Sequence, residues 1–74
     1  LNMNPTELIC ERLHTDDLNK EIVTCAVDSL DVLELLFEIE EAYDIDVPRE
    51  IDNDLRGGMT VGQLIKIVED LRTT

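Results

Sequence analysis

One amphipathic stretch, residues 29–43, constrains the fold of this chain more than any other feature. It reads SLDVLELLFEIEEAY, contains neither Pro nor Gly, and consists mostly of strong helix formers. Either Asp28 or Ser29 can act as its N-cap, because either side-chain oxygen can accept hydrogen bonds from the open N–H groups of the first turn. Asp31 falls in that first turn, where a carboxylate meets the positive end of the helix dipole. The stretch therefore predicts a long helix.

At about 100° per residue, this predicted helix has three distinct sides. A broad apolar side, wide enough to face a core, comprises Val32, Leu35, Leu36, Ile39, Ala42 and Tyr43. An acidic row, spread over roughly 80° on the opposite side, comprises Asp31, Glu34, Glu38 and Glu41. A narrow apolar strip beside the acids comprises Leu30, Leu33 and Phe37. A helix that buries only one side does not need this strip, so we expect a neighbouring helix or a partner to cover it.

Three further helices are predicted by their start and stop signals. Residues 4–14 begin with Asn4 as the cap, Pro5 at the first helical position and a glutamate three residues after the cap. Residues 49–56 form a short helix that ends at a Gly-Gly pair. Residues 60–72 begin with the capping box of Thr60 and Gln63. Together they predict an all-α fold, a small antiparallel four-helix bundle of three longer helices and one short one.

The connection between the first two long helices, residues 18–27, is harder to interpret. Its β-branched residues would suit a strand, but the only other strand candidate is the brief Ile45-Asp46-Val47, and an isolated pair of strands is marginal in water. We therefore expect a long irregular loop. Its predicted anchors in the core are Leu18, Ile22, Val23 and Cys25.

Composition excludes several classes of function. The 74 residues suffice for one domain, residues 1–74, and carry 18 acidic against 6 basic side chains, a net charge of −12. Such a charge argues against nucleic acid and anionic membranes and favours basic partners. No apolar run approaches the roughly 20 residues that span a bilayer, so no membrane insertion is expected. With few aromatic residues and no Trp, the core is expected to be aliphatic.

The side chains most often used in catalysis and metal binding are sparse. Cys10 and Cys25 lack the close paired spacing of a zinc site, and we expect them to be buried, reduced thiols rather than a disulfide. His14 is the only histidine, and no Gly-x-Ser-x-Gly turn surrounds Ser29, so a hydrolytic triad has little support. We predict no catalytic residues and no metal site.

The segment DSLDVLELLFEIEEAYDIDVP, residues 28–48, resembles the signature of the acyl carrier proteins, the free-standing bacterial type of phosphopantetheine-binding carrier. The shared features are an Asp-Ser-Leu triplet, an acidic helix, an aromatic residue at its end, and a short segment closed by Val-Pro. The similarity extends from about Leu18 to Leu71. The chain departs from the pattern at Cys25 and Ala26, where the family commonly has a Leu-Gly pair.

This resemblance implies a carrier and not an enzyme. In that family the serine of the triplet carries phosphopantetheine, which implies attachment to Ser29 with Asp28 and Leu30 beside it. The thiol of the arm would hold acyl groups as thioesters for enzymes of fatty-acid, lipid or polyketide-type biosynthesis. The implied partners are a phosphopantetheinyl transferase, acyltransferases, synthases and other acyl-processing enzymes with basic docking patches. Their expected contacts on this chain are Asp31, Glu34, Phe37, Glu38 and Glu41.

Two alternatives remain open on the sequence alone. The chain could be a peptidyl or aminoacyl carrier, although these more often show a Gly-Gly pair before the serine triplet. It could also be an unmodified helical interaction module whose acidic helix docks a basic partner. Under either carrier interpretation we expect a cytoplasmic monomer.

Overall fold

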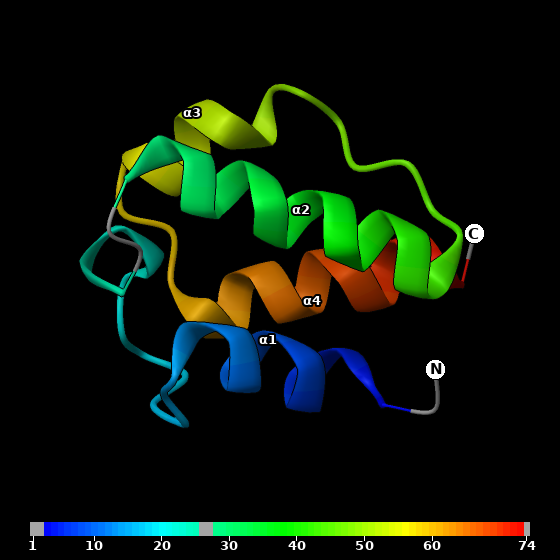
Figure 1. The fold of residues 1–74 in the computed structure, drawn as a ribbon, viewed down its shortest axis with the longest axis horizontal. Coiled ribbons are helices and arrows are strands. Elements are labelled where there is room, and N and C mark those ends of the chain that lie inside the picture. Colours follow the sequence, from blue (N-terminus) through cyan, green and yellow to red (C-terminus); the bar gives the residue numbers. More distant parts are fainter. Residues whose placement is uncertain (1–2, 26–27, 74) are drawn as a thin grey trace.

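Helices account for all the regular structure in the computed structural model, which describes residues 3–25 and 28–73 (Figure 1). In chain order they are α1 (Pro5–Leu13), the 3₁₀ helix η1 (Ile22–Thr24), α2 (Ser29–Tyr43), α3 (Ile51–Arg56) and α4 (Val61–Arg72). Within the described ranges there is no strand, only an isolated bridge between Glu21 and Thr60. The predicted all-α bundle of three longer helices and one short one is confirmed.

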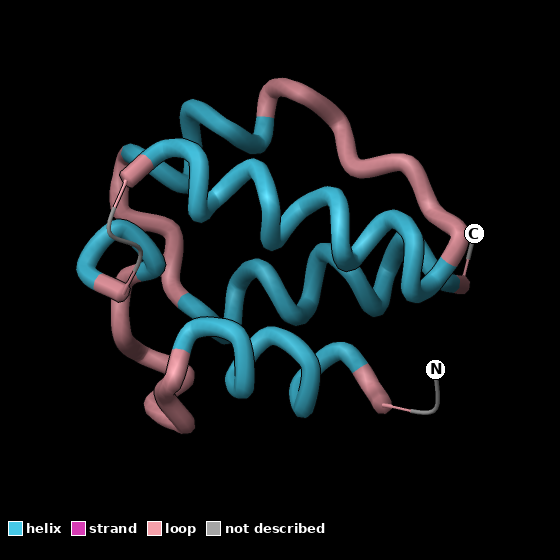
Figure 2. The backbone as a smooth tube through the Cα atoms, in the orientation of Figure 1, coloured by secondary structure: helices cyan, strands magenta, loops and turns pink. Residues whose placement is uncertain are grey.

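The three longer helices do not all run in the same direction. The connection from α1 to α2 reverses the chain, and α1 therefore runs opposite to α2 (Figure 1). The pink connection after α2 and the short helix α3 carry the chain back along the molecule, so that α4 runs in the same direction as α2 (Figure 2). The three longer helices thus lie side by side, with α3 across the end where α2 begins (Figure 1). The predicted antiparallel arrangement holds for α1 against α2 and α4 but is wrong for α2 and α4, which are parallel because the connection that contains α3 returns the chain to the end where α2 begins.

Each of the three longer helices begins with a reciprocal capping box. In each case the N-cap side chain accepts a hydrogen bond from the backbone N–H three residues later, and that later residue's side chain accepts one from the N-cap backbone. The pairs are Asn4 with Glu7, Asp28 with Asp31, and Thr60 with Gln63. The sequence left the cap of α2 open between Asp28 and Ser29, and the structure assigns it to Asp28.

The core is aliphatic, as predicted. The predicted core side of α2 supplies four buried residues to it: Val32, Leu35, Leu36 and Ile39. The other helices contribute residues at helical spacing, among them Leu8, Ile9, Ile51, Leu55, Val61, Leu64, Ile65 and Val68. Ala42 and Tyr43 are half-buried and pack against this cluster. At the end of α2, the Tyr43 hydroxyl donates a hydrogen bond of 2.9 Å to the carbonyl of Met3.

The anchoring of the connection between α1 and α2 differs from our prediction at two of its four residues. Ile22 is fully buried and Cys25 packs half-buried against the core, but Leu18 and Val23 are 44% and 47% exposed. The prediction was wrong for Leu18 and Val23. Residues 22–24 form a 3₁₀ turn with three residues per turn, so consecutive side chains point about 120° apart. Ile22 therefore points inward while Val23 points into solvent.

Backbone hydrogen bonds to the start of α4 hold this connection in place instead. The N–H of Ile22 donates to the carbonyl of Met59, and the N–H of Val61 donates to the carbonyl of Lys20, both at 2.9 Å. Leu18 contributes through its carbonyl, which accepts from the N–H of Gly62 at 2.9 Å. A Cβ at residue 62 would lie 3.1 Å from that carbonyl oxygen, so a glycine permits the close approach. Residues 26 and 27, which complete the predicted loop, lie outside the described ranges.

The short third helix begins later than predicted. It starts at Ile51 rather than Arg49, because residues 48–51 form a turn closed by the N–H of Ile51 on the carbonyl of Pro48 at 3.2 Å. Its two inward-facing residues, Ile51 and Leu55, are buried as predicted. The chain then passes through Gly58, whose φ of 108° is a conformation that L-residues rarely adopt.

Candidate functional site

The start of α2 is built around the carboxylate of Asp28. Its Oδ1 accepts hydrogen bonds from the N–H groups of Leu30 at 2.9 Å and Asp31 at 3.1 Å. In return, Oδ2 of Asp31 accepts from the N–H of Asp28 at 3.3 Å. Ser29 is therefore the first residue inside the helix, immediately after the cap. The structure describes the backbone of Ser29 but not its side chain.

The capping bonds of Asp28 occupy backbone N–H groups that could otherwise bind an anion at the start of α2. A helix N-terminus attracts phosphate because its first N–H groups have no partner within the helix. Here the carboxylate of Asp28 already occupies two of them, those of Leu30 and Asp31. Both chain neighbours of Ser29, Asp28 and Leu30, are exposed, so the start of α2 lies at the surface. The surroundings fit a phosphodiester-linked group held by its covalent bond and aided by the helix dipole.

The acidic row lies on the surface, as predicted, but its members are in different environments. Asp31, Glu34 and Glu41 are exposed and Glu38 is half-exposed. Asp31 belongs to the capping box. The carboxylate of Glu34 makes no hydrogen bond or ion pair with any described residue. Glu38, in contrast, is bound by an arginine from another helix.

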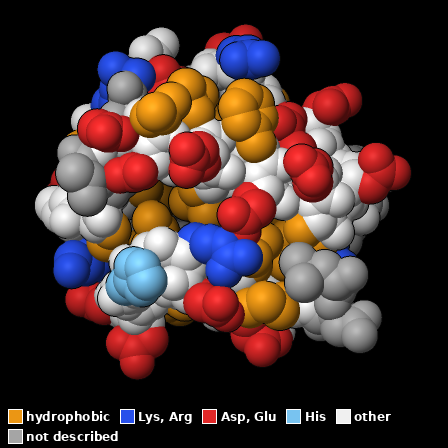
Figure 3. Space-filling view, in the orientation of Figure 1, with side chains coloured by type: hydrophobic (Ala, Val, Ile, Leu, Met, Phe, Trp, Pro, Cys, Tyr) orange, Lys and Arg blue, Asp and Glu red, His pale blue; other side chains and the backbone are white. Residues whose placement is uncertain are grey.

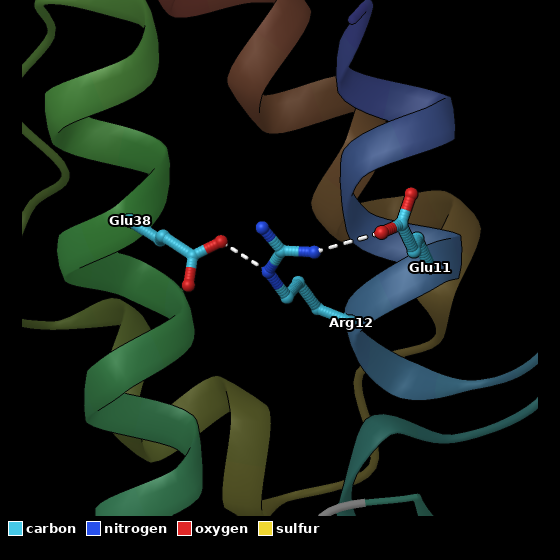
Figure 4. Close-up of polar contacts among 3 residues, drawn as sticks. All are labelled: Glu11, Arg12 and Glu38. Atoms are coloured by element: carbon cyan, nitrogen blue, oxygen red, sulfur yellow. Dashed lines mark hydrogen bonds and ion pairs between the residues drawn. The ribbon is translucent and has the colours of Figure 1, made fainter.

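That arginine is Arg12, in the last turn of α1 (Figure 4). Its Nε donates to Oε2 of Glu38 on α2, and its Nη1 donates to Oε1 of Glu11 at 3.1 Å. The hydrogen bond to Glu38 raises the pKa of Arg12 above its usual value, with the neighbouring carboxylates acting in the same direction. The sequence assigned no role to Arg12. Nothing in its local pattern shows that Arg12 meets Glu38, a residue 26 positions away in the chain.

The apolar strip of α2 is divided between solvent and a neighbouring segment. Leu30 and Phe37 are 61% and 50% exposed, whereas Leu33 is half-buried. Figure 3 shows hydrophobic side chains lying among acidic ones on the face that α2 crosses. Leu30 and Phe37 are therefore exposed apolar side chains on the helix that carries the acidic row.

Two hollows flank α2. The first, about 250 Å³, lies between α1 and α2 and is lined by Arg12, Leu13, His14, Cys25, Asp31, Glu34, Leu35 and Glu38. The second, about 200 Å³, lies between α2 and the segment that leads to α3, and is lined by Leu33, Leu36, Phe37, Glu40, Val47, Pro48, Arg49 and Asp52. In the second hollow, Glu40 accepts a hydrogen bond from the N–H of Val47 at 2.9 Å and so holds that segment against the helix.

Two cysteines and one histidine are the other side chains considered above for catalysis or metal binding. Cys10 and Cys25 are both free thiols, as predicted. We expected both to be buried, but in the structure both are half-buried. Burial raises the pKa of Cys10, and the negative charge of Asp16 adds to this, so its reactive thiolate form is disfavoured. His14 is exposed at the C-cap of α1. Among residues 3–25 and 28–73, no group of three or more His, Cys, Asp or Glu side chains could hold a metal ion.

Comparison with known proteins identifies the family. The sequence profile described as a phosphopantetheine attachment site matches residues 6–68. The acyl carrier protein of Sulfurovum sp. (strain NBC37-1) is 35% identical over 71 residues, which cover 96% of this chain and 81% of that protein. The acyl carrier protein of Wolinella succinogenes is 35% identical over 69 residues, covering 93% and 78%. The chain belongs to the family of phosphopantetheine-carrying acyl carrier proteins. No solved structure matches the chain.

Membership of the acyl carrier protein family confirms the resemblance seen in the sequence. Proteins of this family are carriers and not catalysts, and they depend on a phosphopantetheinyl transferase and on acyl-processing enzymes. When attached, the phosphopantetheine group supplies a thiol at the end of a flexible arm. None of the helices in the described part of the chain is long and apolar enough to cross a bilayer.

Proposed function

We propose that Ser29 carries the phosphopantetheine group and that the chain delivers acyl groups bound to it. The observation that supports this most directly is that Ser29 is the only serine in the chain. It lies within the matched region 6–68 and begins the helix that carries the acidic row. Asp28 and Leu30, its exposed neighbours, form the rest of the attachment site.

The chain's own residues contribute position and charge rather than chemistry. Asp28 fixes the start of α2 through three capping hydrogen bonds, so the attachment point sits on a rigid helix rather than on a loop. The exposed neighbours leave the attached arm free to reach outward. The net charge of −12 steers the carrier toward basic surfaces and speeds each encounter without requiring tight binding.

The surface that meets partners is, in this proposal, the acidic row with the exposed members of the apolar strip. It comprises Asp31, Glu34, Phe37, Glu38 and Glu41, with Leu30 at the end nearest Ser29. The partners are the transferase and the acyltransferases, synthases and related enzymes of fatty-acid, lipid or polyketide-type biosynthesis, with basic residues at their docking patches. The two free cysteines support a cytoplasmic site of action, where thiols remain reduced.

Intact-mass measurement tests the attachment site. After co-expression with a broad-specificity phosphopantetheinyl transferase, the protein is expected to gain the mass of one phosphopantetheinyl group. The Ser29→Ala variant should gain none while keeping its helical content, because the cap of α2 is Asp28 and not Ser29. Helical content is measured by circular dichroism.

The matched control removes the hydroxyl of Thr24, the hydroxyl-bearing residue nearest to Ser29 in the sequence. Thr24 lies in η1, exposed, five positions before Ser29 in the chain. Thr24→Ala should gain the full mass. A Ser29→Ala protein that is still modified, or a wild-type protein that is never modified, would contradict the proposal.

A further inference from the structure

The partner surface proposed above is interrupted by one of the chain's own cations. Arg12, from α1, binds Glu38 in the middle of the acidic row (Figure 4). The side chains of Arg12 and Glu38 are 40% and 43% exposed, so the pair lies at the surface where a partner would approach. Only 6 side chains of this chain are basic, against 18 acidic ones, and one of the 6 binds Glu38.

Glu34, one turn closer to Ser29, presents the opposite case. It is exposed, and its carboxylate has no hydrogen-bond or ion-pair partner among the described residues. Both glutamates line the same 250 Å³ hollow between α1 and α2, and Arg12 lines it from the α1 side. Two carboxylates of the same type, four residues apart on one helix, therefore offer a partner different electrostatic targets.

The intramolecular pair changes what an approaching cation meets. A partner's arginine or lysine meets a Glu38 whose Oε2 already accepts from Arg12 and whose charge Arg12 partly neutralises. For that oxygen, Arg12 competes at the high effective concentration of a group on the same chain. At Glu34, no side chain in the described ranges has to be displaced. Leu13 and Leu35 line the same hollow as Glu34. The apolar stem of a partner's lysine or arginine can pack against these two leucines.

We propose that Arg12 determines which acids of α2 a partner can use, by masking Glu38 and directing the partner's basic residue to Glu34. This inference rests on the proposed function, since it concerns the docking of the enzymes that act at Ser29. It makes Arg12 a specificity-determining residue: it disfavours partners whose docking needs a cation at Glu38. Exposed ion pairs are weak, so Arg12 shifts partner choice by a few-fold and does not block docking.

A double-mutant cycle on Arg12 and Glu38 tests the masking. The measured quantity is kcat/KM for transfer of phosphopantetheine to the apo-protein by a broad-specificity transferase at low salt. Arg12→Gln should raise it by about threefold, the scale of an exposed ion pair. Glu38→Gln should change it by less than about twofold when Arg12 is present, but should lower it by about threefold when Arg12 is already Gln.

Lys66→Gln is the charge-matched control. Lys66 is exposed on α4 and belongs to no ion pair with a described residue, and its loss makes the same change in net charge as the loss of Arg12. It should alter kcat/KM less than Arg12→Gln, and the effect of Glu38→Gln should be the same with or without it. If Lys66→Gln matches Arg12→Gln, or if Glu38→Gln acts equally in both Arg12 backgrounds, only net charge matters and the masking is overturned.

A second measurement decides the question without any modification of Ser29. Tetralysine is titrated into the apo-protein while the side-chain carboxyl resonances of Glu34 and Glu38 are followed by NMR. In the wild-type protein Glu34 should shift more than Glu38, and in Arg12→Gln the two should shift comparably. Equal shifts in the wild-type protein would overturn the masking. Absence of mass gain at Ser29 would instead overturn the proposed attachment site, so the two failures are distinguishable.

Discussion

The two apolar sides of α2 have the same kinds of residues and opposite environments. The core side buries Leu35 and Ile39 against α1, α3 and α4. The apolar strip, on the same helix, leaves Leu30 and Phe37 at least half exposed. The two sides differ in what the rest of the chain brings against them, and not in hydrophobicity.

The core side of α2 stabilises the fold, whereas the exposed residues of the apolar strip contribute little to its stability. Burial of the core side contributes most of what holds α2 in the bundle, because removing apolar surface from water is the main favourable term in folding. The exposed members of the strip gain little from folding, and an exposed apolar patch tends to promote unwanted association. A partner surface gives these residues a use, which is why we place docking there and not on the core side.

The largest effect is expected on the core side. Ile39→Ala should lower the free energy of unfolding by about 2–5 kcal/mol, because it removes a fully buried side chain and leaves a cavity. This is a large share of the roughly 4–11 kcal/mol that a domain of 74 residues typically has. Urea unfolding followed by circular dichroism measures it. The matched variant is Leu30→Ala on the strip, for which the change should stay within about 0.5 kcal/mol.

Equal losses in Ile39→Ala and Leu30→Ala would remove the distinction between the two sides. The same would follow from a small loss in Ile39→Ala, since that side would then not be the core.

Much of α2 could be predicted from the sequence because its information is local. Helical spacing fixes the angles between side chains, and the sequence contains both the cap and the absence of breakers. The strip was predicted to need a cover, and the structure shows that the cover is partial. Leu33 and Phe37 both line the hollow beside the segment with Val47 and Pro48, but only Leu33 is half-buried there. Phe37 remains 50% exposed, and Leu30, which does not line this hollow, is 61% exposed.

The errors occurred where distant segments decide the outcome. Ile22 and Val23 are adjacent β-branched residues, and composition cannot show that a 3₁₀ turn sends one inward and the other outward. The pairing of Arg12 with Glu38 depends on how α1 and α2 pack, and no sequence period records it. For the same reason, the sequence placed the four acids on one side of the helix but could not show that Glu38 alone among them is paired with Arg12.

An intermediate effect is expected at Asp28, which lies where the two sides of α2 begin. Asp28→Ala removes the acceptor for the N–H groups of Leu30 and Asp31 and should lower the free energy of unfolding by about 1 kcal/mol. Asp28→Asn is the control, because asparagine caps helices about as well as aspartate. Urea unfolding of the two variants distinguishes loss of the cap from loss of the charge. If Asn is as harmful as Ala, charge rather than capping accounts for the role of Asp28.

The smallest effect on stability, and the most informative for docking, is expected at Phe37 and Glu34. Phe37→Ala and Glu34→Lys should each change the free energy of unfolding by no more than about 0.5 kcal/mol, since both side chains are exposed. Their effects on binding to the transferase should differ in kind. Glu34→Lys reverses a steering charge, so it should slow association, and added salt should reduce the difference. Phe37→Ala removes apolar contact area, so it should mainly speed dissociation and depend little on salt.

Surface-bound transferase and the apo-protein variants in solution allow both rate constants to be measured. Glu41→Lys is the matched charge control, because Glu41 is also exposed but lies two turns farther from Ser29 than Glu34 does. It should slow association less than Glu34→Lys if docking centres on the Ser29 end of α2. Should Phe37→Ala prove as destabilising as Ile39→Ala, the strip would belong to the core. The partner would then have to bind through the acids alone, and Phe37→Ala would alter docking only through loss of the folded state.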